Sequence, residues 1–468
     1  MLHLKTKLFF LPLEIKTREL YPKLYFAKKA LEKNFSCFIG DKAGIFRATK
    51  YFNSGVYFYK SINFTDTDHI KKIKKNNNKY IVLDEEGGFT FNTVYEFKKF
   101  QSVRSSKENV SLIDKYFNWG NFDNNLYVKK YPKSKNKFCV SGGLRFEVCK
   151  KSIVNKVYKK QIDEIKKIYG KKYILITTSH LTSKKEVINY RQSDKYFMNL
   201  RTKKNKNERF KELNSMLKLN SEFKKLLLDL FKSFPEENFI LRPHPSENLN
   251  DWKNFFKKNL NISKNISINT THDLNALIYN SKCVINSKSA SAMHAFFQKK
   301  PIISFIPNNV KYTKRLIDYI GSKAKNKKKV LNLIKDILNK KFFFSSSMDA
   351  KTRLALSDHV CNMNSKIKPT NVILKEVKKI YKSKSTINLI KVKFYSPFYL
   401  MSDFIFKILK IKYYNPKLYN AGIRSGLEKM GTKGINKSEI INFFKNHDMI
   451  NKINILSFGK NCFLIYKI

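Results

Sequence analysis

The stretch Asn-Phe-Ile-Leu-Arg-Pro-His-Pro, residues 238–245, decides the fold that we predict for this chain. Its apolar first half predicts a buried parallel strand, and Arg242 and His244 follow on either side of Pro243 at the carboxyl end of that strand. Ligands of open α/β sheets bind at this end. A cationic pair held there by prolines suits a phosphate or a carboxylate, so Arg242, His244 and Pro245 are candidate phosphate contacts. The alternative is a stiffened strand exit with a solvated arginine.

Apolar strand segments and helical segments alternate around this stretch, which predicts a Rossmann-like parallel sheet. The expected strands are Tyr173–Thr177, Phe239–Leu241, Ile266–Asn269, Cys283–Asn286 and Pro301–Ile306, and the expected helices are Arg209–Phe234, Asp273–Asn280 and Ser289–Gln298. An earlier series predicts another such sheet, with strands at Leu8–Leu13, Phe35–Gly40, Gly55–Tyr59, Tyr80–Leu83 and Phe138–Ser141. The polar residues 183–208 between the two series predict a loop.

The length of 468 residues favours two α/β domains over one core. We expect two Rossmann-like domains whose parallel sheets face a central cleft, over residues 1–165 and 166–385. Residues 386–468 have a weaker pattern and are expected to form a helical or mixed extension.

The formal net charge of +58 suggests a polyanionic partner, but the composition argues against specific nucleic-acid binding. Only 11 of the 94 basic residues are arginine, and the lysines are spread over nearly every segment. A protein that grips phosphates or reads bases favours clustered arginine. Some attraction to anionic membranes or polymers still follows, and a non-enzymatic polyanion-binding protein stays open as a distant alternative.

Cysteine spacing and hydropathy indicate the compartment. The six cysteines lie far apart without a CxxC pair, which fits a reducing cytosol. The short apolar run before Pro12 predicts a first strand and not a signal peptide. Charged residues interrupt the apolar stretch from Phe394 to Ile411, which favours a core or interfacial helix over a membrane span. We expect a cytoplasmic protein with peripheral contact with the inner face of the membrane.

An acidic cluster follows the expected strand Tyr80–Leu83. Asp84, Glu85 and Glu86 precede a Gly-Gly pair there. Three carboxylates cannot all stay buried and unpaired, so one of them is a candidate general base at the strand end. The alternative is an acidic turn with solvated side chains.

Hydroxyl side chains follow two further strands of the second series. Ser287, Ser289 and Ser291 join a strand to a helix, and Thr178 and Ser179 follow the strand Tyr173–Thr177. Small hydroxyl residues beside free backbone N–H groups can bind an anion. The alternative at Ser289 is a simple helix N-cap.

The end of the first strand carries Glu14, Arg18 and Glu19, which are candidate acceptor-side residues. The simpler interpretation pairs Arg18 with Glu14 across one helical turn. Asp66 and Asp68 imitate a metal-holding DxD motif but precede a helical segment, which favours a helix cap. No histidines stand at metal-ligand spacing, so we expect no metal site and no cofactor.

Five segments together resemble the bacterial surface carbohydrate biosynthesis proteins, which have the two-domain GT-B glycosyltransferase fold. They are LPLEIKTREL (11–20), DEEGG (84–88), GGLRFE (142–147), RPHPSE (242–247) and residues 287–304. The acidic and His-Pro motifs are also similar to those of bacterial sialyltransferases and polysialyltransferases. The resemblance implies an N-terminal acceptor domain followed by a nucleotide-sugar domain.

The same resemblance implies roles for individual residues. Glu85 would be the general base, and His244 with Pro245 would contact the phosphate of a CMP-sugar donor. Ser287 and Ser289 would correspond to the hydroxyl motif that also holds the donor phosphate. The remaining cleft residues that the resemblance implies are Gly143, Arg145 and His294. Many GT-B relatives carry Glu at the last of these positions, where it holds the ribose.

We therefore expect a metal-independent, inverting glycosyltransferase. It would transfer a sugar from a nucleotide donor, with a CMP-linked acidic sugar as one candidate, to a surface polysaccharide or lipid-linked glycan. Cationic side chains would stabilise the departing phosphate, a carboxylate of the other domain would deprotonate the acceptor, and the cleft would close before the reaction. The nearer alternative is another GT-B enzyme, a sugar-nucleotide 2-epimerase or a polymer phosphotransferase.

Overall fold

The computed structural model describes residues 3–63, 66–85, 105–170, 172–179, 203–244, 247–259, 261, 265–311, 315–341, 348, 350–362, 366–381, 383–408 and 434–468. The chain forms two compact units: Met1–Val157 with Ser357–Ile468 make unit 1, and Tyr158–Leu356 make unit 2. The boundaries therefore differ from the expected 1–165, 166–385 and 386–468, because the C-terminal segments add strands to the first sheet.

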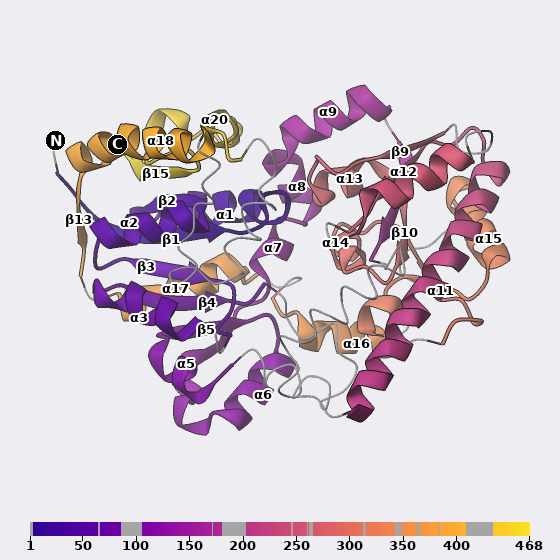
Figure 1. Cartoon of the computed structure of the whole chain (residues 1–468), viewed down its shortest axis with the longest axis horizontal. Coiled ribbons are helices and arrows are strands. Elements are labelled where there is room, and N and C mark those ends of the chain that lie inside the picture. The colour runs from indigo at the N-terminus through magenta and orange to yellow at the C-terminus, as the bar shows by residue number, and fades with distance from the viewer. Residues whose placement is uncertain are drawn as a thin grey trace. The chain divides into compact units, whose positions relative to one another are not determined.

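Unit 1 is built on one sheet (Figure 1). Its strands are β1 (His3–Leu13), β2 (Phe35–Asp41), β3 (Val56–Tyr59), β4 (Lys79–Leu83), β5 (Lys115–Asn118), β6 (Phe138–Val140), β13 (Ser385–Asn388), β14 (Ile453–Ser457) and β15 (Cys462–Lys467). The order is β14-β15-β2-β1-β3-β4-β5-β6, and β2 to β6 with β1 run parallel. The chain reverses its winding between β1 and β3, which is the point where doubly wound sheets bind ligands.

Helices cover the unit 1 sheet because its strands are apolar on both faces. The helices are α1 (Lys16–Leu31), α2 (Lys42–Tyr51), α3 (Thr67–Lys75), α5 (Lys107–Leu112), α6 (Asn121–Lys130), α7 (Leu144–Glu147), α8 (Lys151–Val157), α17 (Pro369–Ile380), α18 (Leu389–Ile408) and α20 (Lys437–Lys445). Leu8 and Phe10 of β1 join a core with residues of α2, α3 and α18. Phe9 points to the other face, where its ring centre lies 5.8 Å from that of Phe26 of α1.

The C-terminal segment is not a separate extension. β15 pairs antiparallel with β2, β14 pairs with β15, and β13 pairs antiparallel with the start of β1. The expectation of a helical or mixed extension misses these strands because their partners lie hundreds of residues away along the chain. The segment thus completes the sheet on which the unit 1 residues stand.

Unit 2 has a six-stranded, all-parallel sheet. Its strands are β7 (Tyr173–Thr178), β8 (Phe239–Arg242), β9 (Ile266–Ile268), β10 (Ser281–Ser287), β11 (Ile302–Phe305) and β12 (Ser322–Ala324), in the order β12-β11-β10-β7-β8-β9. This is the Rossmann order, whose topological switch point lies between β7 and β10. The predicted α/β class with two Rossmann-like parallel sheets is confirmed.

Helices also cover both faces of the unit 2 sheet. They are α9 (Lys159–Tyr169), α11 (Lys203–Ser233), α12 (Leu249–Lys258), α13 (Leu274–Asn280), α14 (Ser291–Phe297) and α15 (Lys327–Leu338), and α16 (Ala350–His359) follows where the chain returns to unit 1. One core combines residues of α11, α12 and α15 with the strands, and Trp252 is fully buried in it. The long helix α11 is visible in Figure 1. It begins at Lys203, so the end of the expected loop 183–208 is helical.

Among the described residues, no helix has the length and apolarity to cross a membrane. The six cysteines form no disulfide, and four of them are buried.

Candidate functional site

Charged side chains meet at the carboxyl ends of β1 to β4 in unit 1. We call this group the carboxylate edge; its members are Glu14, Arg18, Glu19, Lys23, Lys42, Lys60, Glu85 and Arg145. Glu14 follows β1, Lys42 follows β2, Lys60 follows β3 and Glu85 follows β4. Arg18, Glu19 and Lys23 belong to α1, and Arg145 belongs to α7. Burial and charge differ among the three carboxyl groups, and these differences decide their protonation.

Glu14 lies at the switch point and is paired with two lysines. Lys60 forms an ion pair with Glu14 Oε2, and Lys42 Nζ lies 3.4 Å from the same oxygen. Burial alone would raise the pKa of Glu14, but the two lysines outweigh it and the pKa is lowered. The expected pairing of Arg18 with Glu14 is not observed, because Arg18 turns to Glu19 and the strand-end lysines occupy Glu14.

Glu19 is the most strongly held carboxylate of the edge. It accepts hydrogen bonds from the Glu14 backbone N–H at 2.9 Å, from Arg18 Nη2 at 2.7 Å and from Lys23 Nζ at 3.2 Å. Burial raises the pKa of Glu19, but Lys23 and Arg18 lower it further, so the net pKa lies far below the usual value. Glu19 therefore stays ionised and fixes the two cations.

Glu85 has the opposite electrostatic balance. Its side chain is only 6% exposed, and this burial raises its pKa more than Lys23, Arg18 and Arg145 lower it. The negative charge of Glu19 adds to the rise. Arg145 Nη1 donates to the Glu85 backbone carbonyl at 3.2 Å, which fixes the chain at this point. Carboxyl groups whose environments push their pKa values apart are typical of acid–base sites.

The neighbours of Glu85 have structural partners. Asp84 Oδ2 accepts a hydrogen bond from the Tyr116 hydroxyl at 2.7 Å and is buried. Gly143 is the N-cap of α7, the short helix that carries Arg145. The guanidinium of Arg145 lies 5.0 Å from the ring centre of Trp119, which holds it in place. The predicted residue Glu86 lies outside the described residues.

A buried cluster of hydroxyl and amide side chains lies at the unit 2 switch point. We call it the Asn286 cluster; it consists of Thr177, Asn286, Ser289 and Ser291. Asn286 of β10 stands beside Thr177 of β7 in the parallel register. Thr177 Oγ1 donates to Asn286 Oδ1 at 3.2 Å, and Ser291 Oγ lies 2.6 Å from Thr177 Oγ1 and 3.0 Å from Ser289 Oγ.

The side-chain amide of Asn286 is an available hydrogen-bond donor in this Asn286 cluster. Its Nδ2 is buried and finds no hydrogen-bond partner among the residues that the structure describes. Ser287, the next residue, is fully buried, and Lys288 then adopts a left-handed φ of 56°. The helix expected over Ser289–Gln298 is observed as Ser291–Phe297, with Ala290 as its N-cap. Ser289 Oγ accepts a hydrogen bond from the Ser291 backbone N–H at 3.3 Å.

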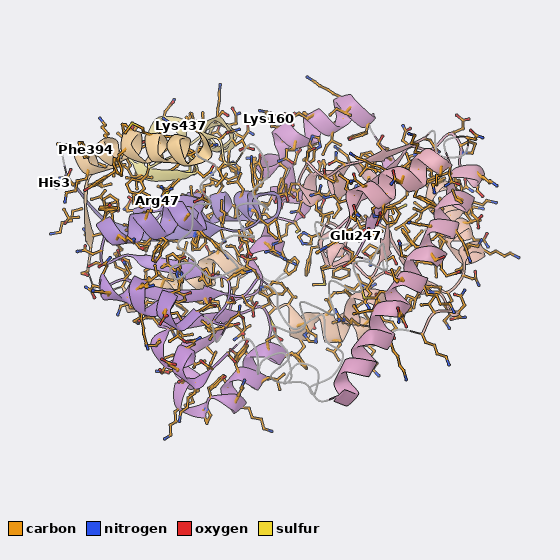
Figure 2. The ribbon with its side chains drawn as sticks, viewed as in Figure 1. His3, Arg47, Lys160, Glu247, Phe394 and Lys437 are labelled. Carbon is orange, nitrogen blue, oxygen red and sulfur yellow. The ribbon has the colours of Figure 1, made fainter. Side chains whose placement is uncertain are left out.

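The other predicted residue after β7 is fixed by Glu247. Thr178 Oγ1 donates to Glu247 Oε2 at 2.9 Å, and Trp252 Nε1 donates to the same oxygen at 2.8 Å. Figure 2 labels Glu247 within unit 2. Ser179 follows as a half-buried residue. The last residue of the RPHPSE motif thus connects β7 to the core under α12.

Arg242 ends β8 and His244 follows it with an exposed side chain. Arg242 Nη1 donates to the Asn269 carbonyl at 3.0 Å, beyond the end of β9. Burial lowers the pKa of Arg242 to about 10 and raises that of Asp273 to about 7, and their mutual attraction offsets only part of each shift. Pro245 lies outside the described residues. His244 is the more accessible of the two cationic candidates.

His294 is part of the core of unit 2. It is buried, and its Nδ1 lies 2.9 Å from Asn275 Oδ1. Asn275 in turn donates through Nδ2 to the Tyr158 hydroxyl at 2.9 Å. In this position His294 connects α14 to α13.

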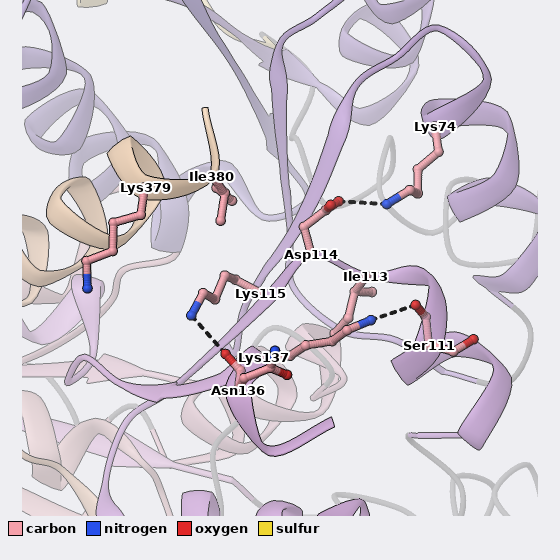
Figure 3. Close-up of a pocket in the computed structure, with 9 residues that line it drawn as sticks. All are labelled: Lys74, Ser111, Ile113, Asp114, Lys115, Asn136, Lys137, Lys379 and Ile380. Carbon is pink, nitrogen blue, oxygen red and sulfur yellow. Dashed lines mark hydrogen bonds and ion pairs between the residues drawn. The ribbon is translucent and has the colours of Figure 1, made fainter. Parts of the chain in front are cut away.

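A hollow of about 450 Å³ lies at the opposite edge of the unit 1 sheet, at the amino ends of β5 and β6 (Figure 3). Lys74 Nζ pairs with Asp114 Oδ2 at 2.8 Å, and Lys137 Nζ donates to the Ser111 carbonyl at 2.6 Å. Lys115 and Lys379 also line the hollow, and both pair with Glu376. Its lysines therefore already have protein partners, unlike the donor of Asn286. Within the described residues, no group of three or more His, Cys, Asp or Glu is arranged to hold a metal.

No family model and no curated protein matches this sequence. Among solved structures, the chain is similar to the UDP-GlcNAc 2-epimerase of Methanocaldococcus jannaschii, with 13% identity and a TM-score of 0.47 over 80% of this chain and 99% of that one. It is also similar to the Neisseria meningitidis UDP-GlcNAc 2-epimerase bound to UDP-GlcNAc, with 11% identity and a TM-score of 0.47 over 80% and 99%. The wall teichoic acid polymerase TagF gives 13% identity and a TM-score of 0.49 over 80% and 89%.

Several residues that contact the predicted site residues have no role in the sequence-based prediction. Lys23, Lys42 and Lys60 were not among the candidates, although each stands one helical turn or one residue from a strand end or a predicted acid. Glu247 and Asn286 belong to motifs that the sequence singled out, but neither was given a role. The position of Asn286 at the end of β10 is a signal that could have found it, whereas Glu247 lies beyond the end of β8 and gives no such signal.

Proposed function

We propose that this protein is a metal-independent glycosyltransferase that uses a nucleotide sugar and a surface polysaccharide or lipid-linked glycan acceptor. The feature that carries the proposal is the contrast in pKa among the three buried carboxyl groups of the carboxylate edge. Glu14 and Glu19 have lowered pKa values, whereas Glu85 has a raised one. A carboxylate with a raised pKa is a stronger base, and it suits removal of a proton from a sugar hydroxyl.

Unit 2 would bind the donor. Its switch point offers the amide of Asn286, and His244 stands exposed after β8. When the sugar leaves its nucleotide, negative charge grows on the phosphate. Hydrogen-bond donors and a protonated His244 would stabilise that charge. We therefore assign the general base to unit 1, where Glu85 has a raised pKa, and donor binding to unit 2, where Asn286 and His244 can contact a phosphate.

A donor screen followed by a transfer assay tests the proposal. The purified chain is heated with CMP-, UDP-, GDP- and CDP-linked sugars, because a ligand that binds only the native state raises the melting temperature. The stabilising donor is then incubated with and without a glycan acceptor. Acceptor-dependent transfer supports the proposal. Conversion of the donor without acceptor would indicate an epimerase instead, and DNA binding without any nucleotide effect would indicate a polyanion-binding protein.

A further inference from the structure

Helix α18 of unit 1 exposes a row of large apolar side chains to solvent. Phe394 is 72% exposed and Met401 58%, and Ile390 and Phe398 are at least half exposed. With Leu400, these residues make up five of the ten exposed large hydrophobic side chains in the described part of the chain. Figure 2 labels Phe394 on α18. Such a concentration within one helix marks an interaction surface.

The spacing of these residues places them on one side of α18. Ile390, Phe394 and Phe398 follow one another at intervals of four residues, and Met401 follows after three, so they share a face. We call these four residues the α18 face. The opposite side is anchored, because Val392 is fully buried in the unit 1 core and the ring centre of Tyr395 lies 4.4 Å from that of Tyr51. The helix is therefore fixed with its apolar face outward.

Lysines flank the α18 face. Exposed Lys391 and Lys393 fall to either side of it at 100° per residue, and exposed Lys384 lies just before β13. No Asp or Glu occurs between Ser383 and Ser402, and the first acidic residue in the sequence of α18 is Asp403. Exposed Lys5 of β1 pairs in register with Thr386 of β13, just before the helix. The apolar face is therefore flanked by positive charge.

We propose that the α18 face docks this protein on an anionic lipid bilayer. A helix with apolar residues on one side and flanking lysines lies in the plane of the headgroups, where its apolar side chains enter the acyl boundary and its lysines meet anionic lipids. A second copy of the chain is a poorer occupant, because it would bring the same lysines face to face. The inference stands without the proposed function, since it concerns only where the protein binds.

Vesicle co-sedimentation of the full chain tests this inference without any nucleotide sugar. Vesicles of phosphatidylcholine with phosphatidylglycerol should bind the protein, and pure phosphatidylcholine should bind it at least ten-fold more weakly. Replacing both aromatic residues, Phe394→Asn with Phe398→Asn, should weaken binding by at least about ten-fold, since two large apolar side chains leave the bilayer. Lys391→Gln and Lys393→Gln should each weaken it by about five-fold.

The matched control is Ile168→Asn in α9, which makes a similar apolar-to-polar change at a side chain that is 61% exposed. It should bind vesicles like the parent protein. Melting temperatures of all variants should lie close to that of the parent, because each replaced side chain is largely exposed. Equal vesicle binding by parent and Phe variants would overturn the proposal. So would a concentration-dependent dimer, measured by sedimentation velocity, that the Phe substitutions abolish while the parent fails to bind vesicles.

Discussion

Replacing Glu85 with glutamine separates the proposed base from its structural surroundings. Glu85→Gln keeps the shape of a side chain that is only 6% exposed but removes its ability to take a proton. Loss of a general base lowers turnover by about 10²- to 10⁴-fold, which corresponds to about 3–5 kcal/mol of transition-state stabilisation. Donor affinity should stay nearly unchanged, because the side chains proposed to bind the donor lie in unit 2. Sugar transfer under saturating donor measures the effect.

The same substitution should not lower stability, and the sign follows from the pKa. The pKa of Glu85 is raised above 4.5 in the folded protein, mainly by burial. Its contribution to stability is therefore fully present below pH 4.5 and is lost as pH rises through the folded pKa. Glutamine has no charge to bury, so the melting temperature of Glu85→Gln relative to the parent should rise as the pH rises above 4.5. Thermal unfolding across this range measures the difference.

The control is Glu108→Gln, the same chemical change in the exposed ion pair between Glu108 and Lys71. It should leave both turnover and melting temperature nearly unchanged, since an ion pair between solvent-exposed side chains contributes little to stability. A folded Glu85→Gln protein that transfers sugar within about three-fold of the parent would refute the assignment of Glu85. A parent rate that does not rise with pH above 4.5 would also count against it.

Three further substitutions test the remaining assignments. Glu19→Gln leaves Lys23 and Arg18 without their buried carboxylate, so chemical denaturation at pH 7 should show a free energy of unfolding lower by about 3–5 kcal/mol. Because the pKa of Glu19 is lowered, this loss should shrink as pH falls below 4.5. A loss that does not depend on pH would contradict the ion-pair account. His244→Ala should weaken donor binding by about 10- to 100-fold in titration calorimetry if a charged contact worth about 1.5–3 kcal/mol is lost, and unchanged affinity would remove His244 from the donor site. Asp273→Asn should gain melting temperature relative to the parent as pH rises from 5 to 8, because the pKa of Asp273 is raised to about 7 by burial; a gain independent of pH would show that Asp273 is not titrating there.

The strands that carry the candidate residues could be predicted from the sequence because their apolar runs are continuous. β4, β7, β8 and β10 lie within two residues of their expected bounds, whereas β1 begins five residues before the expected Leu8. β5 was missed because only two of its four residues, Tyr116 and Phe117, are hydrophobic. β14 and β15 were missed for a different reason, since their place beside β2 depends on pairing across the whole chain.

The partners of the site residues were harder to predict for a compositional reason. In a chain with 94 basic residues, a lysine at any given position carries little information. Only the fold shows that Lys42 and Lys60 reach the same oxygen of Glu14, after two different strands. The raised pKa of Glu85 likewise depends on burial that no local pattern encodes. The residue types at the strand ends could be predicted from the sequence, but the charges and burial around them could not.

Titration calorimetry of the full chain with CMP, UDP, GDP and CDP tests the central claim most directly. If the sheet edge between β7 and β10 binds a nucleotide, one of the four should bind saturably. Asn286→Ala should then weaken the binding of that nucleotide by roughly ten-fold, as expected for the loss of one buried hydrogen bond. The absence of binding by all four, or equal binding by the parent and Asn286→Ala, would contradict the account.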